Sequence, residues 1–408
     1  MKYYKLNDLC TDIIDCPHST PEWKNEGIRV VRNFNLKNGN LDFSDGYYVD
    51  EETYLDRIKR ATPEEEDIII SREAPMGVVA IVPKGLKCCL GQRLVLLKVN
   101  KKKVNPIYLL FILMSDFVQT QFKRADATGS IVSNLCIPDL KDIIIPVIEE
   151  GQENVAKLLE NINEKILLNK RINDNLQQQL RLLYDYWFTQ FDFPDVNGNP
   201  YKSSGGAMVW NSILNREIPA CWEVDKLLNI VSWESNSQPP KSEFVYEPKE
   251  GYIRFIQNRD YDSDNHKTYI PYTKNLSTVD RFDILMDKYG DAGAVRYGIE
   301  GAFNVALGKI NVNRPNYQEY IRSFLESDGV YSYLHNSCMA STRASLNESN
   351  LSMLNVVIPD EETLCAYQLQ IRKIRESILL TNDENLQLEN LRNWLLPMLM
   401  NGQAVVQD

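Results

Sequence analysis

The residues best suited to metal or nucleophile chemistry are eight cysteines and three histidines, and their spacing gives little support for such a site. No two cysteines form a Cys-x-x-Cys pattern, and His18, His266 and His335 lack zinc-ligand spacing. Cys10, Cys16 and His18 could converge on one metal ion, but buried free thiols are the commoner use of cysteine in reducing compartments. We therefore expect no metal site and no cofactor bound by this chain.

Motifs for methyl transfer and phosphodiester cleavage are incomplete. A methyltransferase acting on adenine needs a glycine-rich cofactor motif and an Asn/Asp-Pro-Pro-aromatic segment, whereas residues 199–201 are Asn-Pro-Tyr. Metal-dependent nucleases need Pro-Asp followed by Glu-x-Lys, and residues 22–24 and 247–249 supply only the second half. The sequence also has no Gly-x-x-x-x-Gly-Lys loop. We expect a non-catalytic protein; the rival is a carboxylate site around Asp283 and Asp287, which metal-dependent turnover by the isolated chain would reveal.

Two segments have the pattern of long paired helices. In residues 149–190 and 361–400, seam residues recur at alternating steps of four and three, as in a coiled coil. Each position of the second seam lies 212 residues after one of the first, with Arg392 as the break in the apolar match. The first seam is Val155, Leu159, Ile162, Ile166, Asn169, Asn173, Leu176, Leu180, Leu183 and Trp187; the second is Tyr367, Ile371, Ile374, Ile378, Thr381, Asn385, Leu388, Arg392 and Leu395.

Asn173 and Asn385 occupy equivalent positions in the two seams. A polar seam residue can set the register and orientation of a helix pair at some loss of stability. The alternative is that both asparagines face solvent at a bend. Helices of about forty residues, roughly 60 Å long, cannot bury their seams alone. We therefore expect these two helices to pair with each other or with another protein, and pairing with each other is the simpler arrangement.

The remaining segments also repeat, more faintly. Short apolar runs separated by turn residues predict mostly β domains at 1–148 and 221–360, each with a few helices such as 106–123 and 316–326. Residues 191–220, rich in proline, glycine and serine, are predicted to form an irregular connector. The matching pairs are Gly27–Asn33 with Gly251–Asn258, Asp67–Gly77 with Asp283–Gly293, Leu90–Gln92 with Leu307–Lys309, and Ile145-Pro146 with Ile358-Pro359.

Together these motifs resemble the specificity subunit of type I restriction-modification systems. The most characteristic stretch is Leu-Arg-Leu-Leu-Tyr-Asp-Tyr-Trp-Phe-Thr-Gln-Phe-Asp-Phe-Pro at 180–194, followed by Pro-Tyr-Lys-Ser-Ser-Gly-Gly at 200–206. The strand motifs at 67–70 and 283–286 and the doubled Ile-Pro-then-helix layout extend the resemblance over essentially the whole chain. One departure is in the second helix, where Trp-Leu-Leu-Pro at 394–397 replaces the Trp-Phe ending.

The resemblance implies an α+β fold with a pseudo-two-fold internal repeat. Two mostly β target-recognition domains would be separated by two long antiparallel helices that form a coiled coil. The chain would read a bipartite site in double-stranded DNA without being catalytic. It would dock two methyltransferase subunits, which use S-adenosylmethionine, and restriction subunits, which use ATP and Mg²⁺. The N-terminus lacks a signal-peptide pattern and no apolar run spans a bilayer, so we expect a cytoplasmic location.

The hydrogen-bonding edges of the bases indicate which side-chain types are candidates for DNA binding. Arginine recognises guanine through paired hydrogen bonds, and asparagine or glutamine recognises adenine. Small polar residues at 127–134 and 340–347 suit phosphate contacts. The candidate DNA-binding residues are Arg29, Arg32, Arg72, Arg93, Lys123, Arg124, Arg254, Asn258, Arg259, Lys288, Arg296, Lys309 and Arg343.

The net charge is the main observation against DNA binding. The formal charge is −11, and no predicted domain is basic as a whole. Because phosphate neutralisation supplies most non-specific affinity, a DNA-binding surface here must be a local patch. The acidic charge favours an alternative, a coiled-coil scaffold for a protein complex that does not bind DNA.

Overall fold

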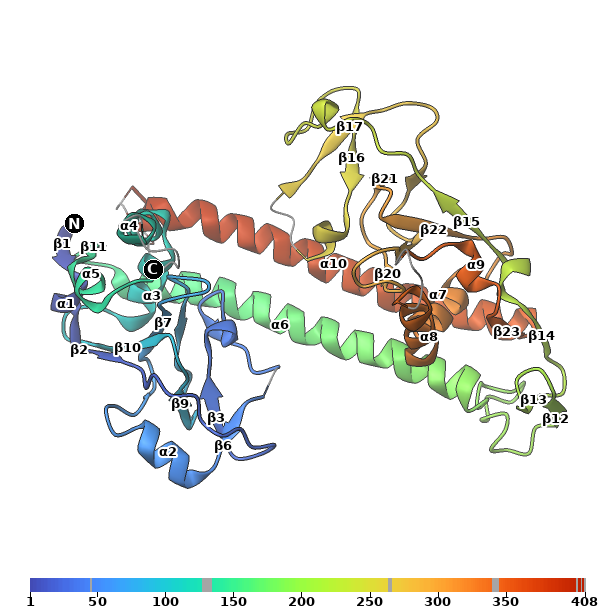
Figure 1. Cartoon of the computed structure of the whole chain (residues 1–408), viewed down its shortest axis with the longest axis horizontal. Coiled ribbons are helices and arrows are strands. Elements are labelled where there is room, and N and C mark those ends of the chain that lie inside the picture. The colour runs from blue at the N-terminus through green and yellow to red at the C-terminus, as the bar shows by residue number, and fades with distance from the viewer. Residues whose placement is uncertain are drawn as a thin grey trace. The chain divides into compact units, whose positions relative to one another are not determined.

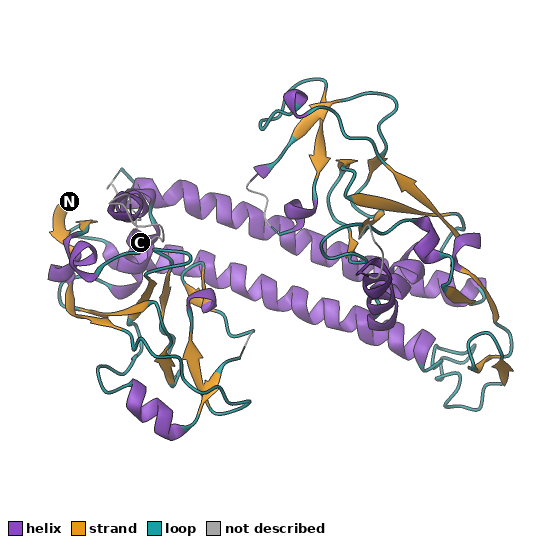
Figure 2. Ribbon diagram, in the orientation of Figure 1, coloured by secondary structure: helices purple, strands orange, loops and turns teal. Residues whose placement is uncertain are grey.

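The computed structural model describes residues 1–408 except 45, 127–133, 263–265, 340–344, 401–402, 405 and 407–408. The chain divides into a first unit, Met1–Asn169 with Asp383–Asp408, and a second unit, Lys170–Asn382. Both units mix helices and strands (Figures 1 and 2), which confirms the predicted mixed α and β architecture. The unit boundary cuts through the long helices, so the predicted domain boundaries stay predictions.

The first unit contains the strands β1 (Lys2–Lys5), β2 (Cys10–Asp15), β3 (Ile28–Val31), β4 (Leu36–Lys37), β5 (Asn40–Leu41), β6 (Tyr48–Val49), β7 (Ile68–Ser71), β8 (Val79–Ile81), β9 (Cys88–Leu90), β10 (Leu94–Val99) and β11 (Ile144–Val147). An antiparallel sheet has the order β2-β10-β7-β8. A second sheet, β6-β3-β9, joins β3 and β9 in parallel. All four residues of β7 are buried, as its unbroken apolar run predicts for a central strand.

The second unit contains the strands β12 (Met208–Asn211), β13 (Arg216–Pro219), β14 (Glu223–Lys226), β15 (Val231–Ser235), β16 (Tyr252–Ile256), β17 (Tyr269–Pro271), β18 (Thr278–Val279), β19 (Ile284–Asp287), β20 (Val295–Arg296), β21 (Gly301–Phe303), β22 (Leu307–Val312) and β23 (Asn355–Ile358). Its antiparallel sheet β15-β22-β19-β20 has the same topology as β2-β10-β7-β8. A parallel pair, β16 with β21, matches β3 with β9. The internal repeat is therefore a repeat of sheet topology.

Strand pairing corrects two of the sequence matches. In the parallel pairs, Val31 lies opposite Leu90 and Ile256 opposite Phe303, so Leu90 corresponds to Phe303 and not to Leu307. Leu307 instead begins β22, the counterpart of β10. Pro146 lies inside β11, whereas Pro359 follows β23. Two-residue matches such as Leu-Gly and Ile-Pro are too short to fix register, which the hydrogen-bond ladders decide.

The glycine turns after β7 and β19 confirm the match of Asp67–Gly77 with Asp283–Gly293. The N–H of Gly77 donates to the carbonyl of Ser71, and that of Gly293 donates to the carbonyl of Asp287, at 2.8 and 2.9 Å. Both glycines have positive φ, +79° and +96°. A Cβ on Gly77 would meet Phe122 at 2.9 Å, and one on Gly293 would meet Leu334 at 3.0 Å, so each turn needs glycine for two reasons.

The first unit's short helices are α1 (Leu6–Leu9), α2 (Glu51–Arg57), α3 (Pro106–Met114), α4 (Asp116–Asp126) and α5 (Ile137–Asp142); those of the second are α7 (Gln318–Glu326), α8 (Asp328–Met339) and α9 (Glu348–Leu351). The single helix expected at 106–123 is wrong, because Ser115 is extended and its hydroxyl donates to the carbonyl of Ile112. Ser327 separates α7 from α8 in the same way. The helix expected at 316–326 is thus only the first half of a second helical pair.

The two long helices expected from the heptad patterns are confirmed as α6 (Gln152–Tyr184), continued by a π-helical turn at Asp185–Thr189, and α10 (Glu361–Met400). In the first unit, Asn169 donates to Asn385 Oδ1 at 2.9 Å, and Arg392 donates to Asn163 Oδ1 at 2.8 Å. Rising numbers on α6 meet falling numbers on α10, so the helices are antiparallel there. Arg392, the break in the apolar match, thus has a polar partner.

The second unit shows the same antiparallel direction. Asn173 donates to Asn382 Oδ1 at 2.7 Å, and the ring of Trp187 lies 5.5 Å from that of Tyr367. Asn173 and Asn385 are 6% and 8% exposed, which rules out the alternative that both face solvent. Each unit therefore contains an asparagine contact between the helices, buried in the first unit and part-buried in the second.

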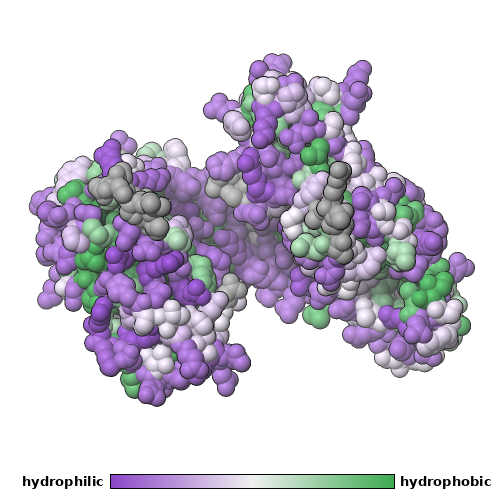
Figure 3. All heavy atoms as spheres, in the orientation of Figure 1, coloured by the Kyte–Doolittle hydropathy of each residue, from purple (hydrophilic) through white to green (hydrophobic). Residues whose placement is uncertain are grey.

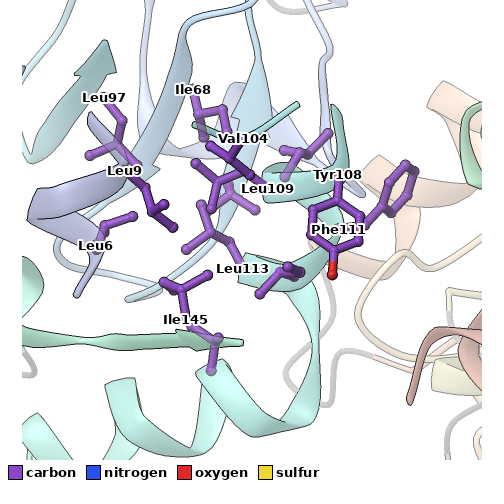
Figure 4. Close-up of a cluster of buried hydrophobic side chains, with 14 of the residues drawn as sticks. Leu6, Leu9, Ile68, Leu97, Val104, Tyr108, Leu109, Phe111, Leu113 and Ile145 are labelled. Atoms are coloured by element: carbon purple, nitrogen blue, oxygen red, sulfur yellow. The ribbon is translucent and has the colours of Figure 1, made fainter. Parts of the chain in front are cut away.

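The first unit's largest core joins the sheet, α3 and α6. Figure 4 shows Leu6, Leu9, Ile68, Leu97, Leu109 and Ile145 converging in this core. Leu396 and Leu399 at the end of α10 pack against the same cluster, because α10 continues through Pro397. This is where the departure from the family's Trp-Phe ending lies.

The connector is not irregular throughout, as residues 208–219 form the antiparallel hairpin β12–β13. Apolar surface gathers over this hairpin (Figure 3), where Val209, Trp210 and Ile213 are exposed. Within the part of the chain that the structure describes, no helix is both long and apolar enough to cross a membrane.

Candidate nucleic-acid interface

A short 3₁₀ turn follows the parallel strand in each unit. β3 leads into Asn33–Asn35, and β16 leads into Asn258–Tyr261. Asn35 Oδ1 accepts the backbone N–H of Arg32 at 2.8 Å, and Asp260 Oδ2 accepts that of Gln257 at 3.1 Å. Arg32 and Gln257 therefore occupy equivalent positions, each at the end of a strand.

Arg32 is surrounded by aromatic rings. Its guanidinium carbon lies 4.4 Å from the ring centroid of Tyr47, 4.6 Å from that of Phe34 and 5.4 Å from that of Trp23. Tyr47 also packs on both other rings, with centroids 4.9 Å from Trp23 and 5.6 Å from Phe34. We call these three rings the aromatic cluster. Cation–π attraction stabilises a guanidinium in such a position.

Arg29 lies on β3, before Arg32, and also packs against an aromatic face. Its guanidinium carbon lies 4.7 Å from the ring centroid of Phe43, and the side chain is half-buried. Arg29 within β3 and Arg32 just after it thus carry two positive charges three residues apart.

Arg72 and Arg93 have carboxylate partners instead. Nη1 of Arg72 donates to both oxygens of Asp15, at 2.9 and 3.0 Å, and its Nε donates to the carbonyl of Leu135. Arg93 Nε lies 3.2 Å from Glu73 Oε2. Arg72 therefore ties β7 to β2, and a base contact by either arginine would have to share or break its ion pair.

Lys123 and Arg124 lie on α4 and are exposed. Arg124 lines a shallow pocket with Tyr3 and Phe117. These two cations are the freest of the first unit's candidates to move toward a phosphate group.

In the second unit, three of the candidates gather around the turn after β16. Nη2 of Arg254 lies 3.9 Å from Asp260 Oδ2, and Nε of Arg259 lies 4.0 Å from Asp260 Oδ1. Arg259 also donates weakly to Thr268 Oγ1, at 3.5 Å, and is exposed. Asn258 begins the turn and is half-buried. One buried carboxylate thus serves two arginines.

Arg296 and Lys309 hold the two aspartates of the rival catalytic interpretation. Arg296 donates twice to Asp287 Oδ2, at 3.2 and 2.8 Å, and Lys309 Nζ donates to Asp283 Oδ2 at 2.8 Å. Burial raises the pKa of Asp287, and the Arg296 contact opposes that rise. Each carboxylate is thus occupied by a cation.

The last two candidates differ in what the structure describes. Lys288 is half-buried, and its backbone bonds to Ala306 and Leu346 hold the end of β19. Arg343 lies outside the described residues, as do 127–133 and 340–344 of the two predicted phosphate-binding loops.

Cys10 and Cys16, two of the residues considered for a metal site, are buried. Burial raises the pKa of the Cys10 thiol to about 12 and also raises that of Cys16, so both resist forming the thiolate that binds metals. His18 instead contacts Asp15, with Nε2 and Oδ2 3.1 Å apart. Within the described ranges, no three His, Cys, Asp or Glu side chains cluster in a way that could hold a metal ion.

The sequence predictions named Arg32 but missed the aromatic cluster around it. Phe34, two residues after Arg32, was the one local signal. Trp23 and Tyr47 lie nine and fifteen residues away and reach Arg32 only because the chain folds back along β3 and β6.

Comparison with known proteins agrees with this architecture. Residues 1–178 match the family model described as the type I restriction modification DNA specificity domain. The MjaIX specificity subunit of Methanocaldococcus jannaschii is 24% identical over 84% of this chain and 78% of its own length. The HindI specificity subunit of Haemophilus influenzae is 20% identical over 74% of this chain and 78% of its own.

A solved structure shows the same fold. The S subunit of a type I restriction-modification system from M. genitalium superposes with a TM-score of 0.60 at 14% identity, covering 97% of this chain and 94% of that one. The family-model match, the specificity subunits that align over most of the chain and the doubled sheet topology agree with one another. The first 178 residues therefore match a type I restriction modification DNA specificity domain, and the chain is similar over most of its length to specificity subunits of type I restriction enzymes.

Proposed function

We propose that this chain is the DNA-reading subunit of a type I restriction-modification complex and that each copy of its doubled sheet reads one half of a bipartite DNA site. The carrying observation is the repeated topology: two antiparallel sheets of the same strand order, each with a parallel strand pair ending in a turn with polar side chains. A split DNA site needs two reading surfaces, and a chain with two copies of one fold supplies them.

The long helices would set the distance between the half-sites. Rigid spacing is needed because readers in the major groove must stay in phase with the DNA helix, whose turn measures roughly 34–36 Å. The antiparallel contacts within each unit support a paired coiled coil, and the buried asparagines would fix its register.

Changing the length of both helices tests this spacing role. Inserting one heptad beside Asn173 in α6 and one beside Asn382 in α10 lengthens each helix by about 10 Å. At about 3.4 Å per base pair, the spacer of the methylated motif should grow by about three base pairs. An unchanged spacer in a complex that still methylates DNA would contradict the spacing role.

The chemistry would belong to partner subunits. Specificity subunits are the non-catalytic members of such systems, and the family works with methyltransferase and restriction subunits on DNA. We propose two methyltransferase subunits per chain, carrying S-adenosylmethionine, and restriction subunits carrying ATP and Mg²⁺. The proposal includes a cytoplasmic location, the compartment that holds the DNA.

The test of this function is a methylome. DNA from cells expressing the methyltransferase partner is sequenced for N6-methyladenine with and without this chain. A chain-dependent mark at a split motif with a fixed spacer is expected. If no such mark appears although the complex assembles, the DNA-reading function is wrong.

The scaffold alternative rests on the acidic charge alone. Specific DNA binding that weakens steeply with salt would exclude it, because release of counterions from phosphates produces that dependence. If the assembled complex did not bind DNA at any salt concentration, the scaffold alternative would be favoured.

A further inference from the structure

The candidate cations differ in how their charge is held. Arg72, Arg93, Arg296 and Lys309 each have a carboxylate of their own unit within 3.2 Å. Among the described residues, no carboxylate forms an ion pair with Arg32, which is half-buried beside its aromatic cluster. An ion-paired guanidinium brings little net charge to DNA, whereas that of Arg32 keeps its full charge.

A second feature of Arg32 is the hydrogen-bonding edge of its guanidinium group. A guanidinium contacts aromatic rings through its planar face, while its five N–H donors point outward in the plane. No described residue accepts a hydrogen bond from the Arg32 guanidinium. Two parallel donors on one edge are what guanine needs, since its O6 and N7 accept side by side in the major groove.

The backbone around Arg32 is fixed as well. Asn35 Oδ1 accepts the Arg32 N–H, and the N–H of Gly91 donates to the carbonyl of Val31 at 2.7 Å. A Cβ on Gly91 would lie 3.2 Å from Arg32 Cγ, so glycine at this position makes room for the arginine stem. A side chain that is already ordered loses less conformational freedom when it binds a base.

The equivalent position in the second unit is built differently. Gln257 replaces Arg32, and its amide nitrogen donates to Thr268 Oγ1 at 2.9 Å. Arg259 takes the place of Phe34 in the turn sequence, since each lies two residues after the matched residue, Gln257 or Arg32. The two turns share a backbone but present different side chains, so they would read different bases.

We propose that Arg32, positioned by Trp23, Phe34 and Tyr47, reads a guanine in the half-site bound by the first unit. This inference rests on the proposed function, because it names the base read by one side chain of the DNA-binding surface. The three rings are positioning residues, and Arg32 is the reading residue. The second half-site, read from the turn with Gln257, would have no arginine held in this way.

The experiment measures the relative binding of duplexes in a pool that varies each motif position singly. The protein is the assembled complex of this chain with its methyltransferase partner, and the motif comes from the wild-type methylome. The variants are Arg32→Gln, Arg32→Lys and Tyr47→Ala. Lys59→Gln is the control, because Lys59 is an exposed cation of the same unit that pairs with Asp56. Complex assembly is checked by size-exclusion chromatography.

The wild type should prefer guanine at one position of one half-site. Arg32→Gln should lower that preference about 5- to 150-fold, the range for losing a paired guanine contact, and leave the other half-site and the spacer unchanged. Arg32→Lys should flatten the same position while retaining the charge, which keeps the inference testable if the glutamine variant assembles poorly. Tyr47→Ala should weaken the same preference to a smaller degree.

Three results would overturn the inference. One is an unchanged preference in Arg32→Gln. Another is a uniform loss at all positions equal to that of Lys59→Gln, which would mean a general charge effect. The third is the absence of any guanine preference in the half-site that Arg32→Gln affects. Absence of chain-dependent methylation by the wild type would instead overturn the proposed function, and this inference with it.

Discussion

The helix that packs with α6 in the first unit and the helix that packs with α10 in the second have the same place in the fold but opposite chemistry. Residues 106–114 of α3 are Pro-Ile-Tyr-Leu-Leu-Phe-Ile-Leu-Met, and seven of the nine are buried. Residues 318–326 of α7 are Gln-Glu-Tyr-Ile-Arg-Ser-Phe-Leu-Glu, and Glu319 and Arg322 are fully buried. One tyrosine is common to both: Tyr108 accepts the N–H of Ile148, and Tyr320 donates to the carbonyl of Val357.

The buried charges of α7 form a network with α10. Glu319 contacts Arg322 and lies 2.8 Å from Nε of Arg375, while Arg375 Nη2 lies 2.7 Å from Glu326 Oε2. The ring of Tyr297 lies between 4.8 and 5.1 Å from both guanidinium carbons. The two long helices correspond at an offset of 212 residues, so the position in the first unit equivalent to Arg375 is Asn163 of α6.

The two units therefore share a strand topology but stabilise the equivalent helices by different interactions. Burial lowers the pKa of Arg322, and the neighbouring Arg375 adds to that effect. A buried ion network need not be more stable than an apolar core, but removing one member is costly because it leaves another charge unpaired. The second unit should therefore be more sensitive to single polar substitutions at this helix contact.

Glu319→Ala should have the largest effect. It removes the carboxylate shared by Arg322 and Arg375 and should lower the free energy of unfolding by about 3–5 kcal/mol, measured by urea denaturation. Hydrogen exchange should show the loss of protection in α7 and α10. The control is Glu376→Gln, which removes an exposed partner of Arg372 and should cost less than about 1 kcal/mol. Equal costs for the two variants would show that the buried network does not stabilise the second unit.

Leu110→Ala is the counterpart in the first unit, at the position equivalent to Arg322. It leaves a cavity in an apolar core and should cost about 2–5 kcal/mol, with the loss of protection confined to α3 and α6. If hydrogen exchange instead showed its main loss in α7 and α10, the two cores would not be independent in the way the comparison requires.

The glycine turns after β7 and β19 are a feature that the two units have in common. Gly77→Ala and Gly293→Ala should each lower the free energy of unfolding by about 1–3 kcal/mol, because both combine a positive φ with a close side chain. Gly85→Ala is the control for φ alone, since Gly85 has φ +75° and no atom within 4 Å of an added Cβ. Costs at 77 and 293 no greater than that at 85 would contradict the role of Phe122 and Leu334.

Replacing Asp360 should have the smallest effect on the free energy of unfolding, and that effect should depend on pH. Burial disfavours its ionised form, but hydrogen bonds from Thr363 and the indole of Trp222 outweigh burial and lower the pKa of Asp360. A lowered folded-state pKa means that the ionised carboxylate stabilises the fold above the unfolded value near 3.9, and that this contribution is lost as pH falls through the folded value.

Asp360→Asn should therefore lower the free energy of unfolding at pH 7 by about 0.5–1 kcal/mol and remove part of its acid dependence. Denaturation at pH 7, 5, 4 and 3 measures both. Glu361→Gln removes one exposed charge in the same helical turn as a control. A difference between wild type and Asp360→Asn that grows toward pH 3 would contradict the sign argued here.

Local patterns predicted a large part of the fold. The seam spacing located α6 and α10, because helices that pair along one face repeat their seam residues about every 3.5 residues. The match of Asp67–Gly77 with Asp283–Gly293 was also correct, because a glycine with positive φ leaves a local mark. Short matches failed where register was at issue, as with Leu90 and Leu307, because a dipeptide carries too little information to align two ladders.

The candidate interface was less accessible from sequence. Arginines could be named as readers by residue type, but their ion pairs depend on carboxylates far away along the chain, as with Arg72 and Asp15.

The sequence by itself determined the two long helices, the repeated strand motifs and the choice of arginine and amide side chains as possible readers, because these depend on spacing and residue type. Only the tertiary structure decided that Arg72 braces a sheet while Arg32 stands in an aromatic cluster. It also decided that the two units hold equivalent helices by apolar packing and by ion pairs. Partners of this kind are brought together by strand pairing between distant segments, which no local pattern encodes.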